Sequence, residues 1–133
     1  MYSDRVLEIF KNPRNAGGLQ GANGVGKAET SNLSDIIKLY IKVDENGVVT
    51  ESRFKTFGCV ASMVCSSVIT EIVINKTIEE LAELTEDYIL DVIGELPQEK
   101  TYALSLTLEA LNNALQDYYK RKEKEEKKQS EEN

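Results

Sequence analysis

No histidine occurs among the 133 residues of the chain, and tryptophan is also absent. The lack of histidine removes the commonest general base and the commonest neutral metal ligand. Any chemistry must therefore come from cysteine, carboxylate, lysine or tyrosine side chains, or from a cofactor. Two cysteines are too few for a disulfide scaffold in a chain of this length. We therefore expect reduced thiols and a cytoplasmic location.

Basic residues are also in short supply. Sixteen lysines and arginines stand against 23 acidic residues, which gives a net charge of −7. Non-specific nucleic-acid binding needs a basic face, so we expect no nucleic-acid partner. No run is long and apolar enough to cross a bilayer, so we expect no membrane association. The remaining balance, 41% hydrophobic and 29% charged, is that of an ordinary single domain.

The most informative stretch is residues 53–59, where an alternating strand pattern runs into Gly58 and Cys59. Helical spacing of apolar residues follows from residue 60 to residue 74, so Cys59 is predicted at a helix N-terminus. The unpaired N–H groups and partial positive charge there favour a thiolate, which is both a nucleophile and a metal ligand. A small buried apolar cysteine is an equally open interpretation at this point.

Two β-rich segments flank a turn centred on Asn46 and Gly47, which predicts an antiparallel hairpin of residues 36–43 and 48–57. Asp35 precedes the first strand and Cys59 follows the second. Hairpin geometry therefore brings these two residues together at the open end. Cys65, six residues further along the helix, is expected to point elsewhere, into the core.

The rest of the chain reads as helices and loops. Apolar spacing predicts a short first helix, capped helices after Thr77 and Thr85, and a last helix from Tyr102. Residues 17–26 are rich in glycine but lack phosphate-loop spacing, so an irregular loop leading to an edge strand is favoured. Strands and helices are segregated, which predicts an α+β fold with a small antiparallel sheet packed against helices. We expect one domain over residues 1–120 and a charged tail, 121–133, that frays into disorder.

Several ordered blocks resemble a known family, the IscU/NifU-type iron–sulfur cluster assembly scaffolds. The blocks are N-P-R-N at residues 12–15, Asp35 with the following Lys-Leu at 38–39, the R-F-K-T-F-G-C stretch at 53–59, and Leu-Pro at 96–97. The resemblance covers roughly residues 2 to 120 with the blocks in matching order, which is more specific than any single motif. The resemblance implies the IscU/NifU-like (SufE/NifU-type) fold. It also implies iron–sulfur cluster assembly and delivery as the function, in a protein that is not itself an enzyme.

The resemblance also implies a site. Such proteins hold a transient [2Fe–2S] cluster on three cysteines and an aspartate, take sulfur from a cysteine desulfurase, and pass the cluster to apo-proteins. Asp35 and Cys59 match two of those ligands. Three further site positions carry degenerate residues, namely Leu33, Tyr102 and Ala103. The segment that a chaperone recognises in the family is kept only at Leu96, Pro97 and Lys100.

Three hypotheses remain, because two ligands cannot close a [2Fe–2S] site within one chain. In the first, two chains form a homodimer and share one cluster through Asp35 and Cys59. In the second, Cys59 accepts sulfur from the desulfurase without building a cluster. In the third, the chain has lost metal binding and is a non-catalytic protein that regulates a desulfurase or a genuine scaffold. Iron alone or zinc could also bind, although zinc prefers four nitrogen or sulfur ligands.

Overall fold

A computed structural model describes residues 1–132. In chain order the elements are α1 (Asp4–Lys11), β1 (Gly24–Glu29), β2 (Ile36–Val43), β3 (Val49–Phe57), α2 (Val60–Ile72), α3 (Ile78–Leu81), α4 (Glu86–Ile93), a 3-10 turn η1 (Gln98–Lys100) and α5 (Tyr102–Glu132). The predicted α+β fold is confirmed, with the strands grouped before most of the helices. None of the helices in this range is long and apolar enough to cross a membrane.

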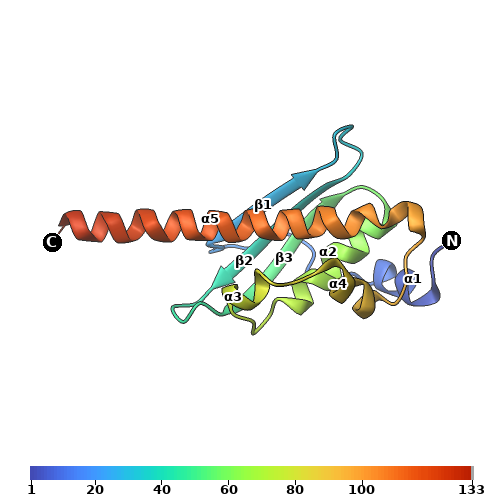
Figure 1. Cartoon of the computed structure of the whole chain (residues 1–133), viewed down its shortest axis with the longest axis horizontal. Helices are drawn as coiled ribbons and strands as arrows, with labels where there is room; N and C mark the ends of the chain where they lie inside the picture. The colour runs from blue at the N-terminus through green and yellow to red at the C-terminus, as the bar shows by residue number, and fades with distance from the viewer. Residues whose placement is uncertain (133) are drawn as a thin grey trace.

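The sheet has three antiparallel strands in the order β1-β2-β3. Alternate residues of β2 are fully or almost fully buried, which gives the sheet an apolar inner face. Helix α5 crosses that inner face and α2 packs beside it, so the core lies between the sheet and these two helices (Figure 1). The predicted hairpin is β2 and β3, and a β-bulge near Val43 adjusts its register.

The edge strand β1 lies unusually close to α5. A Cβ built on Gly26 would stand 2.1 Å from the carbonyl oxygen of Ala110 and 2.2 Å from the nitrogen of Ala114. Only a glycine lets the two backbones approach in this way. The glycine-rich stretch therefore ends in a strand whose glycines are packing positions. The sequence predicted the edge strand but gave these glycines no role.

The helix starts agree with the capping signals in the sequence. Thr77 and Glu80 form a capping box at α3, Thr85 caps α4, and Ser3 caps α1. Helix α2 ends at Ile72, two residues before its predicted end. Cys65 is fully buried, as expected.

The charged tail differs from the prediction. Residues 121–132 continue α5 as one helix that projects beyond the sheet, whereas the sequence indicated a helix fraying into disorder (Figure 1). Lysine and glutamate are good helix formers. Arg121 also pairs with Asp117 one turn earlier at 3.0 Å and donates to the carbonyl of Ala22 at 3.1 Å. The domain boundary at residue 120 stays a prediction.

Candidate functional site

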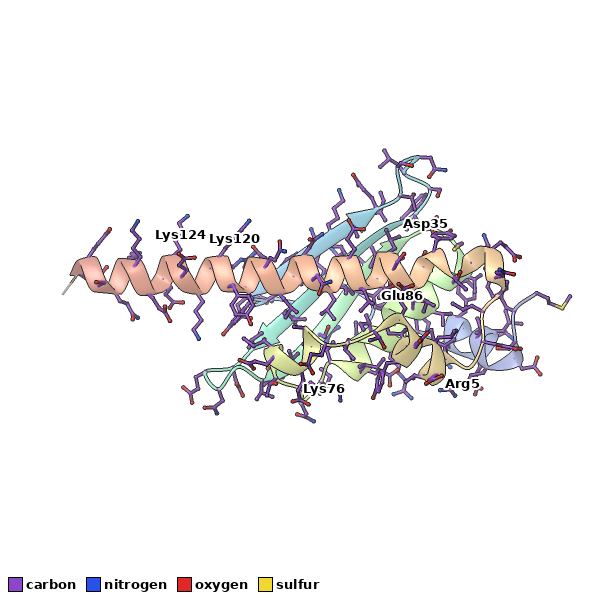
Figure 2. The ribbon with its side chains drawn as sticks, viewed as in Figure 1. Arg5, Asp35, Lys76, Glu86, Lys120 and Lys124 are labelled. Carbon is purple, nitrogen blue, oxygen red and sulfur yellow. The ribbon has the colours of Figure 1, made fainter. Side chains whose placement is uncertain are left out.

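The open end of the hairpin brings Asp35 and Cys59 into contact, as the sequence predicted. Ile36 at the start of β2 pairs with Phe57 at the end of β3, so the residues just beyond this pair are neighbours. The Cys59 Sγ lies 3.2 Å from Oδ2 of Asp35, close enough for the thiol to donate to the carboxylate. Cys59 is the N-cap residue of α2, the position expected from the sequence. Figure 2 places Asp35 near the end of the sheet, beside the start of α5.

Gly58 makes this contact possible. Its φ of +152° lies in a region that side chains with a Cβ rarely adopt. A Cβ at this position would also stand 2.7 Å from Oδ2 of Asp35. The turn from β3 into α2 therefore requires glycine both for its backbone conformation and for the space that the carboxylate occupies.

The Asp35 carboxylate is buried, at 2% exposure, and is surrounded by hydrogen-bond donors. Its Oδ2 accepts from Ser62 Oγ at 2.5 Å, from the Cys59 thiol, from the Cys59 backbone N–H at 3.3 Å, and from the Tyr102 hydroxyl at 3.2 Å. Its Oδ1 accepts from Ser34 at 2.8 Å and from Tyr102 at 3.2 Å. The lone pairs of the carboxylate are thus occupied by protein donors.

This environment keeps Asp35 ionised. Burial alone raises the pKa of the carboxyl, but the hydrogen bonds from Ser62, Ser34 and Cys59 outweigh it and lower the pKa to about 2. Asp35 is therefore a fixed negative charge at neutral pH and a poor proton acceptor. Its role at rest is to organise the donors around it.

Tyr102, the first residue of α5, lies over the same pair. Its hydroxyl is 3.4 Å from the Cys59 Sγ and donates a bifurcated hydrogen bond to the two Asp35 carboxylate oxygens. The hydrogen bond to Cys59, burial and the Asp35 charge raise the pKa of the phenol well above its usual value. Tyr102 therefore remains a neutral hydroxyl that donates hydrogen bonds; that it stands at a degenerate ligand position stays a prediction.

The other two degenerate positions supply no ligand atom. Leu33 is 55% exposed in the loop before Asp35 and has a φ of +59°. Ala103, the second residue of α5, is fully buried. Among residues 1–132, no group of three or more cysteine, aspartate or glutamate side chains is placed to hold a metal ion. What the described residues bring together here is one thiol, of Cys59, and one carboxylate, of Asp35.

Sequence reasoning missed Ser34 and Ser62. Ser62 is the third residue of α2 after its N-cap, a position whose side chain reaches back toward the cap. This spacing was a usable signal. The contact of Ser34 with Asp35 depends on the conformation of the loop around Leu33, which no local pattern indicates.

The second cysteine and the docking segment lie outside this cluster. Burial, reinforced by the neighbouring Cys59, raises the pKa of Cys65 to about 12. Cys65 is thus an inert thiol, whereas Cys59 is partly exposed. Leu96, Pro97 and Lys100 are half-buried in the connector that leads to α5, with Lys100 in η1. The structure brings none of these three into hydrogen-bond contact with Asp35.

Comparison with known proteins agrees with this arrangement. The family model described as the NifU-like N-terminal domain matches residues 1–125. The chain belongs to this family. It is 39% identical over 127 residues to "Iron-sulfur cluster assembly scaffold protein IscU 1" of Archaeoglobus fulgidus, with 96% of this chain and 82% of that protein covered. It is 42% identical to the IscU scaffold protein of Aquifex aeolicus over 88% of this chain and 75% of that protein.

A solved structure confirms the fold. The crystal structure of a nitrogen-fixing NifU-like protein (N-terminal) from Brucella abortus superposes with a TM-score of 0.71, at 21% identity, over 90% of this chain and 94% of that chain. At this identity the likeness concerns the fold alone. The resemblance noted in the sequence blocks is thus confirmed at the level of both family and fold.

Proposed function

We propose that this NifU-like domain is an iron–sulfur cluster assembly scaffold that accepts sulfur and iron and delivers a cluster. The observation that carries the proposal is the contact of the Cys59 thiol with Asp35 at the N-terminus of α2. Relatives that are 36 to 42% identical to it over the aligned residues are named as assembly scaffolds. A Drosophila relative is named an assembly enzyme, but we propose that this chain is not itself an enzyme. A cytoplasmic location belongs to the same proposal.

The donor set determines how a cluster would be held. A [2Fe–2S] cluster needs about four protein ligands, and one chain offers two. Two chains in a homodimer would each supply Cys59 and Asp35 and so complete the set. Both groups must first give up their present partners, because Cys59 donates to Asp35 and Asp35 accepts from Tyr102 and Ser62. Cluster assembly and dimer formation are thus coupled.

Sulfur reaches the site through Cys59. In the step that we propose, the Cys59 thiolate attacks the outer sulfur of a persulfide on a cysteine desulfurase. A new S–S bond forms on Cys59, and the desulfurase thiolate leaves with the electron pair of the broken bond. Since Asp35 has a pKa of about 2, the thiol proton passes to solvent or to the leaving thiolate. Cys65 is fully buried and does not compete for the sulfur.

Partners other than the desulfurase follow from the family. We propose that a recipient apo-protein approaches the same end of the sheet. Chaperone recognition would use Leu96, Pro97 and Lys100, whose connector is partly accessible. Because residues 98 and 99 are glutamine and glutamate, a polar and a charged side chain stand where an apolar contact would be expected.

The experiment that tests the scaffold function is anaerobic reconstitution with ferrous iron, cysteine and a cysteine desulfurase. We expect a visible chromophore close to one cluster per two chains, together with a dimer in size-exclusion chromatography. Cys59→Ser should abolish both, whereas Cys65→Ser is the matched control and should retain both. Iron alone or zinc is distinguished by metal and sulfide analysis. A dimer that persists unchanged in Cys59→Ser would contradict the shared-cluster arrangement.

A regulatory protein without cluster chemistry is the second candidate. The observation that favours it is that Leu33 and Ala103 offer no ligand atom while the lone pairs of Asp35 are already occupied. In this case reconstitution would leave the protein colourless, and mass spectrometry would detect no persulfide on Cys59 after desulfurase turnover. Binding to a desulfurase or to a genuine scaffold would remain. A persulfide on Cys59 without a chromophore would instead identify a sulfur acceptor.

A further inference from the structure

The outer face of the sheet carries a charge opposite in sign to that of the whole chain. The net charge is −7, yet the outward-pointing charged side chains of β1, β2 and β3 comprise five basic and only two acidic residues. The basic ones are Lys27, Lys38, Lys42, Arg53 and Lys55. A solvated sheet face needs polar side chains, but residues of alternating positive and negative charge would stabilise strand pairing better than a mostly basic set. The bias in sign is therefore not explained by folding.

Three of these residues form a continuous row. Lys27 is directly opposite Lys38, and Lys38 is directly opposite Lys55. Like charges in such positions destabilise strand pairing. Lys27 is partly neutralised by Glu29 at 3.4 Å, but within residues 1–132 neither Lys38 nor Lys55 has a carboxylate within 4.0 Å. The lysine row, residues 27, 38 and 55, is therefore a positive strip that one carboxylate compensates only at its Lys27 end.

The lysine row lies beside the candidate site. The next outward position along β3 after Lys55 is Phe57, whose side chain is 70% exposed and lies two residues before Cys59. On the other side, the glycine-rich segment passes close to the outer face, with Gly18 against Lys55 and Gly21 against Lys42. The accessible part of the face thus runs from the lysine row to the exposed ring of Phe57, two residues before the half-buried Cys59.

We propose that the lysine row and Phe57 form a docking surface for an acidic protein segment. The segment would place carboxylates over the three lysines and an apolar side chain on Phe57, so that it ends beside Cys59. A short acidic segment is favoured over a nucleic acid, because a long polyanion would extend beyond the row along a molecule of net charge −7, in which residues 77–99 hold eight acidic and no basic side chains. The proposal does not depend on cluster binding, since it concerns the metal-free chain.

The test is an NMR titration of the full chain with a short poly-glutamate peptide that contains one leucine. We expect shifts at the lysine row and Phe57, and binding that weakens as salt is raised. Lys38→Glu with Lys55→Glu should weaken binding by about tenfold or more, since two attractions become repulsions. Lys120→Glu with Lys124→Glu makes the same change in net charge on the projecting part of α5, away from Asp35, and should leave binding unchanged (Figure 2). If the first pair does not fold, Lys55→Gln replaces it, with a smaller expected loss.

Four results would overturn the proposal. The first is no detectable peptide binding, and the second is an equal loss of affinity in both lysine pairs, which would indicate attraction to net charge alone. The third is tighter binding of an oligothymidylate of equal charge, which would identify a nucleic-acid surface. The fourth is salt-sensitive self-association in sedimentation that Lys38→Glu with Lys55→Glu abolishes, which would identify a second copy as the occupant. The first three results leave the reconstitution experiment unaffected. The self-association of the fourth is distinguished from the dimer expected on reconstitution, because it forms without metal and does not need Cys59.

Discussion

Replacing Asp35 with asparagine tests whether a buried, donor-saturated carboxylate stabilises the fold. In the wild-type chain the pKa of Asp35 is lowered from its usual 3.8 to about 2. One pKa unit corresponds to about 1.4 kcal/mol, so the charged form of Asp35 contributes about 2 to 3 kcal/mol to the free energy of unfolding. The full contribution is present above pH 4. It is lost as the pH falls toward 2, because the unfolded chain then binds the proton first.

The asparagine variant lacks this titration. It also places an amide donor or a weaker acceptor against Ser62, which already donates to Oδ2. We therefore expect a loss of about 2 to 3 kcal/mol at pH 7. Between pH 7 and pH 3 the difference between wild type and variant should shrink by about 1 kcal/mol, because the wild type alone loses the contribution of Asp35.

The assay is urea unfolding of both proteins at several pH values, followed by circular dichroism. Asp91→Asn is the matched control, because Asp91 is exposed on α4 and makes no hydrogen bond to the site. A difference between wild type and Asp35→Asn that stays constant from pH 7 to pH 3 would refute the reasoning. It would mean that the variant loses packing or geometry and that the charge of Asp35 has no part in the effect.

Three further predictions follow from the same contacts. Tyr102→Phe removes one hydroxyl that donates to Asp35 and should cost about 1 kcal/mol in urea unfolding, with an upward shift in the pKa of Asp35; no change in either would show that the hydroxyl is not engaged. Gly26→Ala should cost about 3 kcal/mol or more, because its Cβ would overlap the α5 backbone, whereas Gly18→Ala, which meets the flexible end of Lys55 and the Tyr40 ring at 3.4 Å or more, should cost little. A thiol reagent at neutral pH should modify Cys59 alone in the folded chain and both cysteines in denaturant; modification of Cys65 without unfolding would contradict its burial and its pKa of about 12.

The predictions from sequence succeeded where the signal is local. The hairpin turn at Asn46 and Gly47, the caps at Thr77 and Thr85, and the position of Cys59 each depend on a few adjacent residues. The meeting of Asp35 with Cys59 needed only the hairpin register. These features could be derived because the turn sets the register of a hairpin, and a helix cap depends on residues within about one helical turn.

Other features depended on distant partners and could not be derived. The glycines of β1 are packing positions only because α5, more than eighty residues later, lies across them. The charge of residues 121–132 predicts a helix that frays into disorder, whereas helix propensity and the contacts of Arg121 favour continuation of α5. The donors around Asp35 come from a loop and two helices.

The closed state of the site has a consequence for the order of events in assembly. Asp35 and Cys59 satisfy each other, and Tyr102 and Ser62 complete the carboxylate shell, so the resting chain holds no unfilled buried polar side chain among residues 1–132. Cys59 is the partly exposed group of this arrangement. Once its thiol loses the proton, Cys59 no longer donates a hydrogen bond to Asp35, and the arrangement is broken. If Cys59 accepts sulfur, as we propose, that transfer is the step that opens the site. Iron binding through Asp35 would then follow it, since the carboxylate becomes available only when donors leave.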